Sequence, residues 1–184
     1  AGLVPELLAF ARRLLGRADV PQTFVLNALV PVDFALWQLW NAKRGNGTFD
    51  ALCASFCPEL TNREKELGSI PLITYHTPED ELHALLEDGA FLLKVKIGSD
   101  PEKNGDPEAM LAWDIGRLRT VHTAAAGFTT PYTECGRPVY YLDANGRYPD
   151  REFLLRFLDA ADKMDALERI VLLEEPFAGD RPEP

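Results

Sequence analysis

Apolar positions in the first third of the chain recur at the spacing of an amphipathic helix. Residues 3 to 16 and roughly 22 to 45 follow this pattern, with Pro21 between the two segments. Gly45-Asn46-Gly47 then forms a strong stop signal. The sequence therefore predicts a mostly helical first third.

Beyond Gly68, short apolar runs alternate with amphipathic stretches. The runs that predict strands are 70–75, 91–97, 139–142 and 170–173. The stretches that predict helices are 79–88, 107–126 and 150–164. Regular alternation of this kind predicts parallel strands joined by right-handed helical crossovers, which is an α/β fold.

Two α/β architectures fit this order, an open doubly wound sheet and part of a (β/α) barrel. A doubly wound nucleotide-binding sheet has a glycine-rich phosphate loop after its first strand, and Tyr75-His76-Thr77-Pro78 contains no glycine. This difference favours the barrel. A complete TIM-like barrel needs eight strands and about 250 residues. We therefore expect residues 63–184 to form its first four β/α units, and half of the barrel to be missing from the chain.

Composition limits which binding partners and which cellular compartment we expect. The 184 residues include 19 Lys and Arg against 29 Asp and Glu, and the formal net charge of -10 opposes binding to a nucleic-acid backbone. No apolar run approaches the roughly 20 residues of a membrane-spanning helix, and the chain does not start like a signal peptide. Three unevenly placed cysteines form no disulfide framework, so we expect a cytoplasmic protein with neither nucleic acid nor membrane as a partner.

Two lysines interrupt the apolar run of the second predicted strand. In Leu92-Leu93-Lys94-Val95-Lys96-Ile97-Gly98 they are two residues apart, so strand alternation places both on one face. Inside a barrel, each ammonium needs a carboxylate, a substrate anion or a metal site beside it, because an unpaired buried charge is costly. At a sheet edge, both lysines would lie in water and blunt the edge. The strand alone favours neither alternative.

Acidic residues stand at the ends of the next two predicted strands. Tyr141-Leu142-Asp143-Ala144-Asn145-Gly146 ends the third, and Leu172-Leu173-Glu174-Glu175-Pro176 ends the fourth. In a barrel these ends share one mouth, where active sites are built, and converging carboxylates suit a hard cation such as Mg²⁺. Alternatively, Asp143 forms a turn and Glu174 lies in solvent at a strand end. Together with the inward lysine pair the site interpretation is favoured, because one arrangement explains all three features.

These motifs resemble those of a known family. Lys-x-Lys on a second barrel strand, Asp-x-Asn ending the third and Glu-Glu-Pro ending the fourth are similar to the mandelate racemase and muconate lactonizing enzyme branch of the enolase superfamily. The stretch 32–39, Val-Asp-Phe-Ala-Leu-Trp-Gln-Leu, resembles the last long helix of that family's α+β capping domain. The resemblance covers most of residues 24–177. It implies that residues 1–62 are the helical end of a capping domain that precedes the barrel.

The resemblance also implies a role for each residue. Asp143 and Glu174 would hold Mg²⁺ with a third carboxylate on a fifth strand, beyond Pro184. Lys96 would be the general base that removes the proton alpha to the carboxylate of a small substrate, and the metal would stabilise the enediolate. Lys94, a second catalytic and substrate-binding candidate, would lie near the substrate carboxylate, and Asn145 would hydrogen-bond the substrate. The expected enzyme is an isomerase or lyase: a racemase, epimerase, cycloisomerase or dehydratase that forms a homo-oligomer when full length.

Two other functions fit the same residues. The first is a non-enzymatic acidic α/β interaction module, in which the lysines and carboxylates are structural ion pairs. The second is another metal-dependent barrel enzyme, such as an aldolase or hydrolase, in which Lys96 forms a Schiff base or pairs with a carboxylate. Convergence of Lys96, Asp143 and Glu174 on one mouth is the geometry that separates a site from scattered ion pairs.

Overall fold

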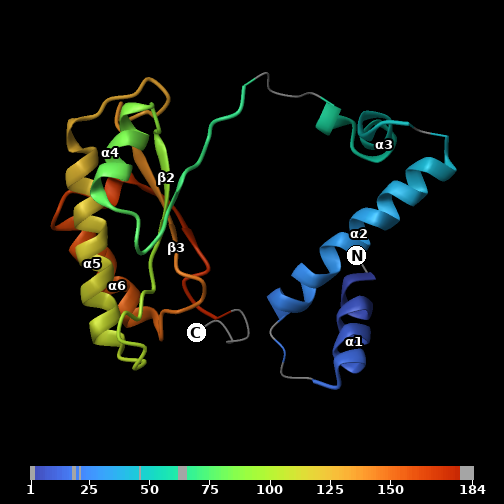
Figure 1. Ribbon diagram of the computed structural model, residues 1–184, viewed down its shortest axis with the longest axis horizontal. Coiled ribbons are helices and arrows are strands. Elements are labelled where there is room, and N and C mark those ends of the chain that lie inside the picture. The colour runs from blue at the N-terminus through green and yellow to red at the C-terminus, as the bar shows by residue number, and fades with distance from the viewer. Residues whose placement is uncertain (1–2, 18–19, 21, 46, 62–65, 179–184) are drawn as a thin grey trace. The chain divides into compact units, whose positions relative to one another are not determined.

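The structure is a computed structural model that describes residues 3–17, 20, 22–45, 47–61 and 66–178 (Figure 1). The chain divides into two compact units, Ala1–Leu67 and Gly68–Pro184. The sequence predicts this boundary after residue 62, and residues 62–65 lie outside the described residues. Each unit is described by itself below.

The first unit is helical, as its apolar spacing predicts. Its elements are α1 (Leu3–Leu15), α2 (Gln22–Lys43), α3 (Phe49–Phe56) and the short 3₁₀ helix η1 (Pro58–Thr61). Helix α2 continues through Pro31 and ends at Lys43, two residues before Gly45, which has a φ of +75°. Helix α3 begins after Thr48, whose hydroxyl accepts a hydrogen bond from the Ala51 N–H at 3.2 Å and so satisfies an N–H of the first turn. The stretch 32–39 lies inside α2.

The second unit alternates strands and helices in the predicted order. Its elements are β1 (Leu72–Ile73), α4 (Glu79–Glu87), β2 (Leu92–Lys96), α5 (Pro107–Ala124), η2 (Ala125–Gly127), β3 (Val139–Asp143), α6 (Arg151–Asp162), η3 (Leu167–Arg169) and β4 (Ile170–Glu174). Asp106 caps α5 and Asp150 caps α6, because each side chain accepts a backbone N–H of the first turn. The strands form one parallel sheet in the order β1-β2-β3-β4. The predicted α/β class is therefore confirmed.

The first strand is shorter than the predicted run 70–75. Only Leu72 and Ile73 pair with β2. The side chain of Thr77 ends the strand, because its hydroxyl accepts the Thr74 N–H at 2.9 Å and folds the backbone into a turn.

The last strand contains one residue that has no partner in β3. Tyr140 pairs with Ile170 and Tyr141 pairs with Leu172, so the register shifts by one at Val171. Beyond the shift, Asp143 pairs with Glu174. The two acids therefore lie side by side at the carboxyl edge of the sheet.

The two faces of the sheet differ. Helices α4, α5 and α6 lie along one face (Figure 1) and enclose the core with side chains from alternate strand positions. The fully buried side chains of this face are Ile73, Leu93, Val95, Ile97, Tyr140 and Leu142. On the opposite face, Leu72 and Leu172 are 48% and 49% exposed. We call this second face the open face; it carries Lys94, Lys96, Tyr141, Asp143 and Glu174. Among the described residues, no helix combines the length and the apolar content that crossing a membrane requires.

Candidate active site

Strand β2 places both predicted lysines on the open face. Leu93 and Val95 point into the helix-covered core and are fully buried, so the intervening Lys94 and Lys96 point the other way. The lysine side chains are 24% and 21% exposed. Because β2 lies between β1 and β3, the alternative of an edge strand with both lysines in water is wrong.

Asp143 is shared by the two lysines. Its Oδ2 atom lies 2.6 Å from Lys96 Nζ and 2.9 Å from Lys94 Nζ, and its side chain is 3% exposed. Burial alone would raise the pKa of Asp143, but hydrogen bonds from Lys96, Lys94 and the Asn145 N–H outweigh it and lower the pKa. Asp143 is therefore held as a carboxylate.

Glu174 is hydrogen-bonded to Lys94 and to a tyrosine. Its Oε2 atom accepts hydrogen bonds from Lys94 Nζ at 2.5 Å and from the Tyr141 hydroxyl at 2.6 Å. Lys94 also donates to the Tyr141 hydroxyl at 3.3 Å. Burial would lower the pKa of Lys94, but the bonds to Glu174, Asp143 and Tyr141 together raise it. Lys94 is therefore a cation that bridges both carboxylates.

Asn145 completes the cluster from the turn that follows β3. Its Oδ1 atom accepts a hydrogen bond from Lys96 Nζ at 2.7 Å, and its N–H donates to Asp143 Oδ1 at 3.2 Å. Asp143 therefore forms a turn by accepting the Asn145 N–H, as its structural interpretation predicts, and it also binds both lysines. The structure brings together all five residues that the sequence analysis singled out (Lys94, Lys96, Asp143, Asn145 and Glu174).

The donor set suits a divalent cation in part. Asp143 and Glu174 lie opposite each other in register, and the single ammonium of Lys94 contacts both carboxylates, so one cation can be reached from both. Carboxylate oxygens are the ligands that Mg²⁺ prefers. Among the residues that the structure describes, however, no group of three or more His, Cys, Asp or Glu side chains could hold a metal. Asp143 and Glu174 therefore bring two carboxylates to this position, and the described residues bring no third.

The sequence pattern did not identify Tyr141 as a site residue. A tyrosine in the middle of a strand indicates only β-structure and packing. Its spacing of two from Asp143 was nevertheless a usable signal, because it places the hydroxyl on the same face as the acid.

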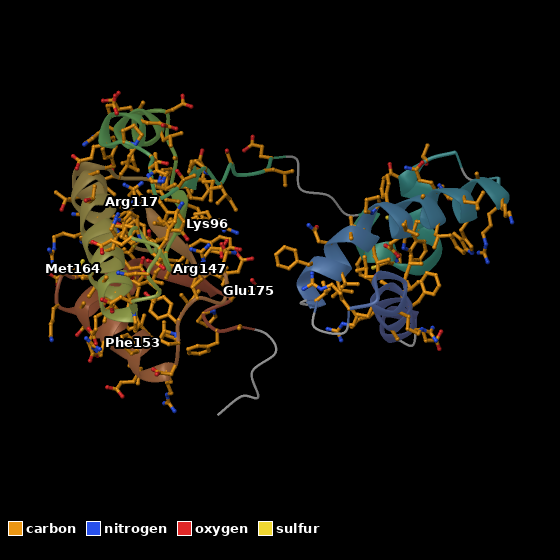
Figure 2. The ribbon with its side chains drawn as sticks, turned by 60° about the horizontal axis from the view of Figure 1, so that its bottom comes forward. Lys96, Arg117, Arg147, Phe153, Met164 and Glu175 are labelled. Carbon is orange, nitrogen blue, oxygen red and sulfur yellow. The ribbon has the colours of Figure 1, made fainter. Side chains whose placement is uncertain are left out.

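A second polar group lies beneath the loops that follow β2 and β3. Asp114 of α5 is fully buried and accepts hydrogen bonds from Gly98 N at 2.8 Å, Ser99 N at 3.2 Å and the Tyr148 hydroxyl at 2.9 Å. Burial raises the pKa of Asp114 to about 6, although these three bonds favour the charged form. In Figure 2, the labels of Lys96 and Arg147 help to locate the ends of β2 and β3, and the label of Arg117 locates α5.

Gly98 packs closely against the loop that follows β3. Its φ is +78°, and a Cβ atom there would lie 2.9 Å from both the Ala144 carbonyl oxygen and Arg147 Cβ. We expect Gly98→Ala to lower the free energy of unfolding by more than about 1 to 2 kcal/mol, the backbone cost alone, because the clash adds to it.

The matched control for that substitution is Gly116→Ala in α5. Apart from its chain neighbours and the nearby backbone of its own helix, no atom lies within 4 Å of the Cβ position at Gly116, so alanine should stabilise the helix by about 0.5 to 1 kcal/mol. Urea denaturation of both variants measures the difference. Equal midpoints would contradict the close approach at Gly98.

Known proteins are similar to this chain in fold but not in sequence. No family model and no curated protein matches the sequence. Among solved structures, the fold is similar to that of a putative mandelate racemase from Bordetella bronchiseptica RB50 complexed with 2-oxoglutarate/phosphate, with a TM-score of 0.44 and 20% sequence identity. The match covers 88% of this chain and 37% of that protein. A likeness at this level does not establish a shared function.

Proposed function

We propose that the chain carries part of the active site of an enolase-superfamily enzyme, of the mandelate racemase and muconate lactonizing enzyme branch, which removes the proton alpha to a substrate carboxylate. The observation that carries the proposal is the convergence of two lysines and two carboxylates at the carboxyl ends of adjacent parallel strands. Active sites of parallel α/β folds are built at that edge.

Each residue has a defined task in this proposal. The Lys96 ammonium, which pairs with Asp143 in the structure, first gives one proton to solvent, and the resulting amine then accepts the α-proton at Nζ. Asn145 can both hold Lys96 through Oδ1 and donate a hydrogen bond to the substrate from Nδ2. Lys94 is a cation and provides the positive charge that attracts the substrate carboxylate.

Asp143 and Glu174 are the proposed Mg²⁺ ligands. When bound, Mg²⁺ supplies the positive charge that stabilises an enediolate. Lys94 bridges these two carboxylates, so it must move its ammonium aside when another cation or a substrate anion enters. Tyr141 donates to Glu174 Oε2 and so restrains that carboxylate while Lys94 moves.

The proposed architecture is the first half of a (β/α) barrel preceded by the helical end of a capping domain. The order of strands and helices supports the barrel, and so does the open face, on which Leu72 and Leu172 are about half exposed. In a closed barrel these side chains would pack against strands on the opposite wall. The third metal ligand and the second acid or base would then belong to those strands. The cytoplasmic location, the small carboxylate substrate and homo-oligomerisation belong to the same proposal.

Proton exchange in D₂O is the direct test. The full-length protein is incubated with a panel of 2-hydroxy, amino and unsaturated carboxylates plus Mg²⁺, and loss of the α-proton signal is followed by proton NMR. We expect exchange with at least one acid, and EDTA should abolish it. The products distinguish racemisation and epimerisation from cycloisomerisation and dehydration. Exchange that persists in EDTA would contradict the metal's role.

One observation favours the non-enzymatic alternative. The two lysines and two carboxylates pair with one another, which is also how a structural ion-pair network would be built. That interpretation predicts that Mg²⁺ leaves the resonances of Asp143 and Glu174 unchanged at millimolar concentration. The enzymatic proposal predicts that Mg²⁺ shifts both.

A further inference from the structure

Asp114 is a buried charged side chain that the proposed chemistry does not use. It lies within α5, and no part of its surface is exposed. Charged groups are rarely buried to this extent unless they have partners. Its partners are the backbone N–H groups of Gly98 and Ser99 and the hydroxyl of Tyr148, and Arg147 and Tyr75 are the charged or titratable groups that interact with it electrostatically.

These partners belong to the two loops that follow strands β2 and β3 of the candidate site. Gly98 follows Lys96 by two residues, and Tyr148 follows Asn145 by three. Further bonds join the same loops: Ile97 N donates to the Asp143 carbonyl at 3.0 Å, and Arg147 Nη1 donates to the Gly98 carbonyl at 3.1 Å. A displacement of either loop therefore changes the position of Lys96 relative to Asn145.

The carboxylate suits this arrangement because it accepts through both oxygens. Oδ2 accepts from Gly98 N and Tyr148, and Oδ1 accepts from Ser99 N. An asparagine at this position has only one oxygen. In either orientation of its amide, an NH₂ group would face a backbone N–H, and at least one buried donor would lose its acceptor.

We propose that Asp114 is a positioning residue of the candidate site: by holding the loops after β2 and β3 from the helix side, it sets the geometry of the Lys96–Asn145 contact on the open face. The inference concerns the same residues as the proposed function, but it is a statement about their geometry and can be tested without a substrate.

The test uses ¹⁵N-labelled full-length protein at pH 7.5, without substrate or metal. In Asp114→Asn, we expect at least one of the Gly98 and Ser99 amides to exchange with solvent about tenfold faster or more, because it loses a buried hydrogen bond. We also expect the side-chain amide signals of Asn145 to shift, since its Oδ1 atom accepts from Lys96. Tyr148→Phe, which keeps both backbone bonds, should shift the Asn145 signals in the same direction by less, and it remains informative if Asp114→Asn does not fold.

The control variant is Arg169→Gln. Arg169 is also a buried charged residue, 7% exposed, but its Nε atom donates to the Pro138 carbonyl at the amino end of β3. This variant should melt at a lower temperature than the parent and leave the Asn145 side-chain signals in place. Unshifted Asn145 signals in both Asp114→Asn and Tyr148→Phe would overturn the proposal. A shift of equal size in Arg169→Gln would also overturn it, because Asp114 would then act only through global stability.

Discussion

Replacing Lys96 by methionine is expected to lower the rate of α-proton exchange by about 100- to 10,000-fold, the usual effect of losing a general base. Methionine keeps much of the apolar length of the side chain but cannot accept a proton. Asp143 and Asn145 should remain in place, because Lys94 still contacts Asp143. The loss should therefore appear in kcat and not in the affinity for the substrate. Exchange is measured by proton NMR in D₂O with any acid that the full-length protein accepts.

The control for that substitution is Lys163→Met. Lys163 follows α6 as its C-cap residue and is exposed, so its loss should leave the exchange rate unchanged. Exchange at the parent rate in Lys96→Met would assign the base to another residue. A new borohydride-trappable adduct at Lys96 in the parent would instead support the aldolase-type alternative.

The second large expected effect is a loss of folding stability in Asp143→Asn. Asp143→Asn leaves two ammonium groups next to each other with only Glu174 as a countercharge. Breaking a buried ion pair costs about 3 to 5 kcal/mol, and because the lysines are 24% and 21% exposed we expect the lower end, about 3 kcal/mol. Urea denaturation at pH 7 measures the loss. Adding Lys96→Met to Asp143→Asn should restore part of the stability, because the repulsion is then removed.

The pH dependence of this loss has a defined sign. The pKa of Asp143 is lowered in the folded state, so its contribution is present above the pKa of the unfolded chain and is lost as the pH falls through the folded value. The urea midpoints of the parent and Asp143→Asn should therefore converge below about pH 4. Asp114 has a raised pKa and the opposite sign, but it is present in both proteins and cancels in the difference.

An exposed ion pair provides the control for the stability experiment. Arg156 binds Glu108 through two 2.7 Å hydrogen bonds between α6 and α5, and both groups are exposed. Glu108→Gln should leave the urea midpoint nearly unchanged, because solvent screens such pairs. If Asp143→Asn were as mild as Glu108→Gln, the lysine–carboxylate cluster would not be coupled to the fold.

The sequence predicts the strands of the second unit well where alternation is strong. In β2, apolar and lysine positions alternate, and the structure places the lysines opposite the core. The clustering of Lys96 with Asp143 and Asn145 follows from strand alternation plus the rule that parallel strands end at one edge. The length of β1 could not be predicted, because it depends on one side-chain hydrogen bond from Thr74 N to Thr77.

Contacts between distant segments account for what the sequence does not predict. Asp114 is in the middle of a helix, where an acid is normally solvated, and its partners are 15, 16 and 34 residues away. Tyr141 contacts Glu174, which is 33 residues away. Local pattern carries no information about such pairs. The roles of the site residues, the metal and the capping domain remain predictions for the same reason, since they depend on chemistry and on partners that spacing does not specify.

The unpaired Val171 determines which side chain of β4 meets Asp143. If Val171 paired with Tyr141, the register of Tyr140 with Ile170 would continue along the strand, and Leu173 would take the position opposite Asp143. Lys94 would then lose its second carboxylate. A register shift of one residue between β3 and β4, with no change in any charged residue, would therefore convert an acidic pair into a single acid. The acidic pair therefore depends on the register of β4 as well as on which residues the strand contains.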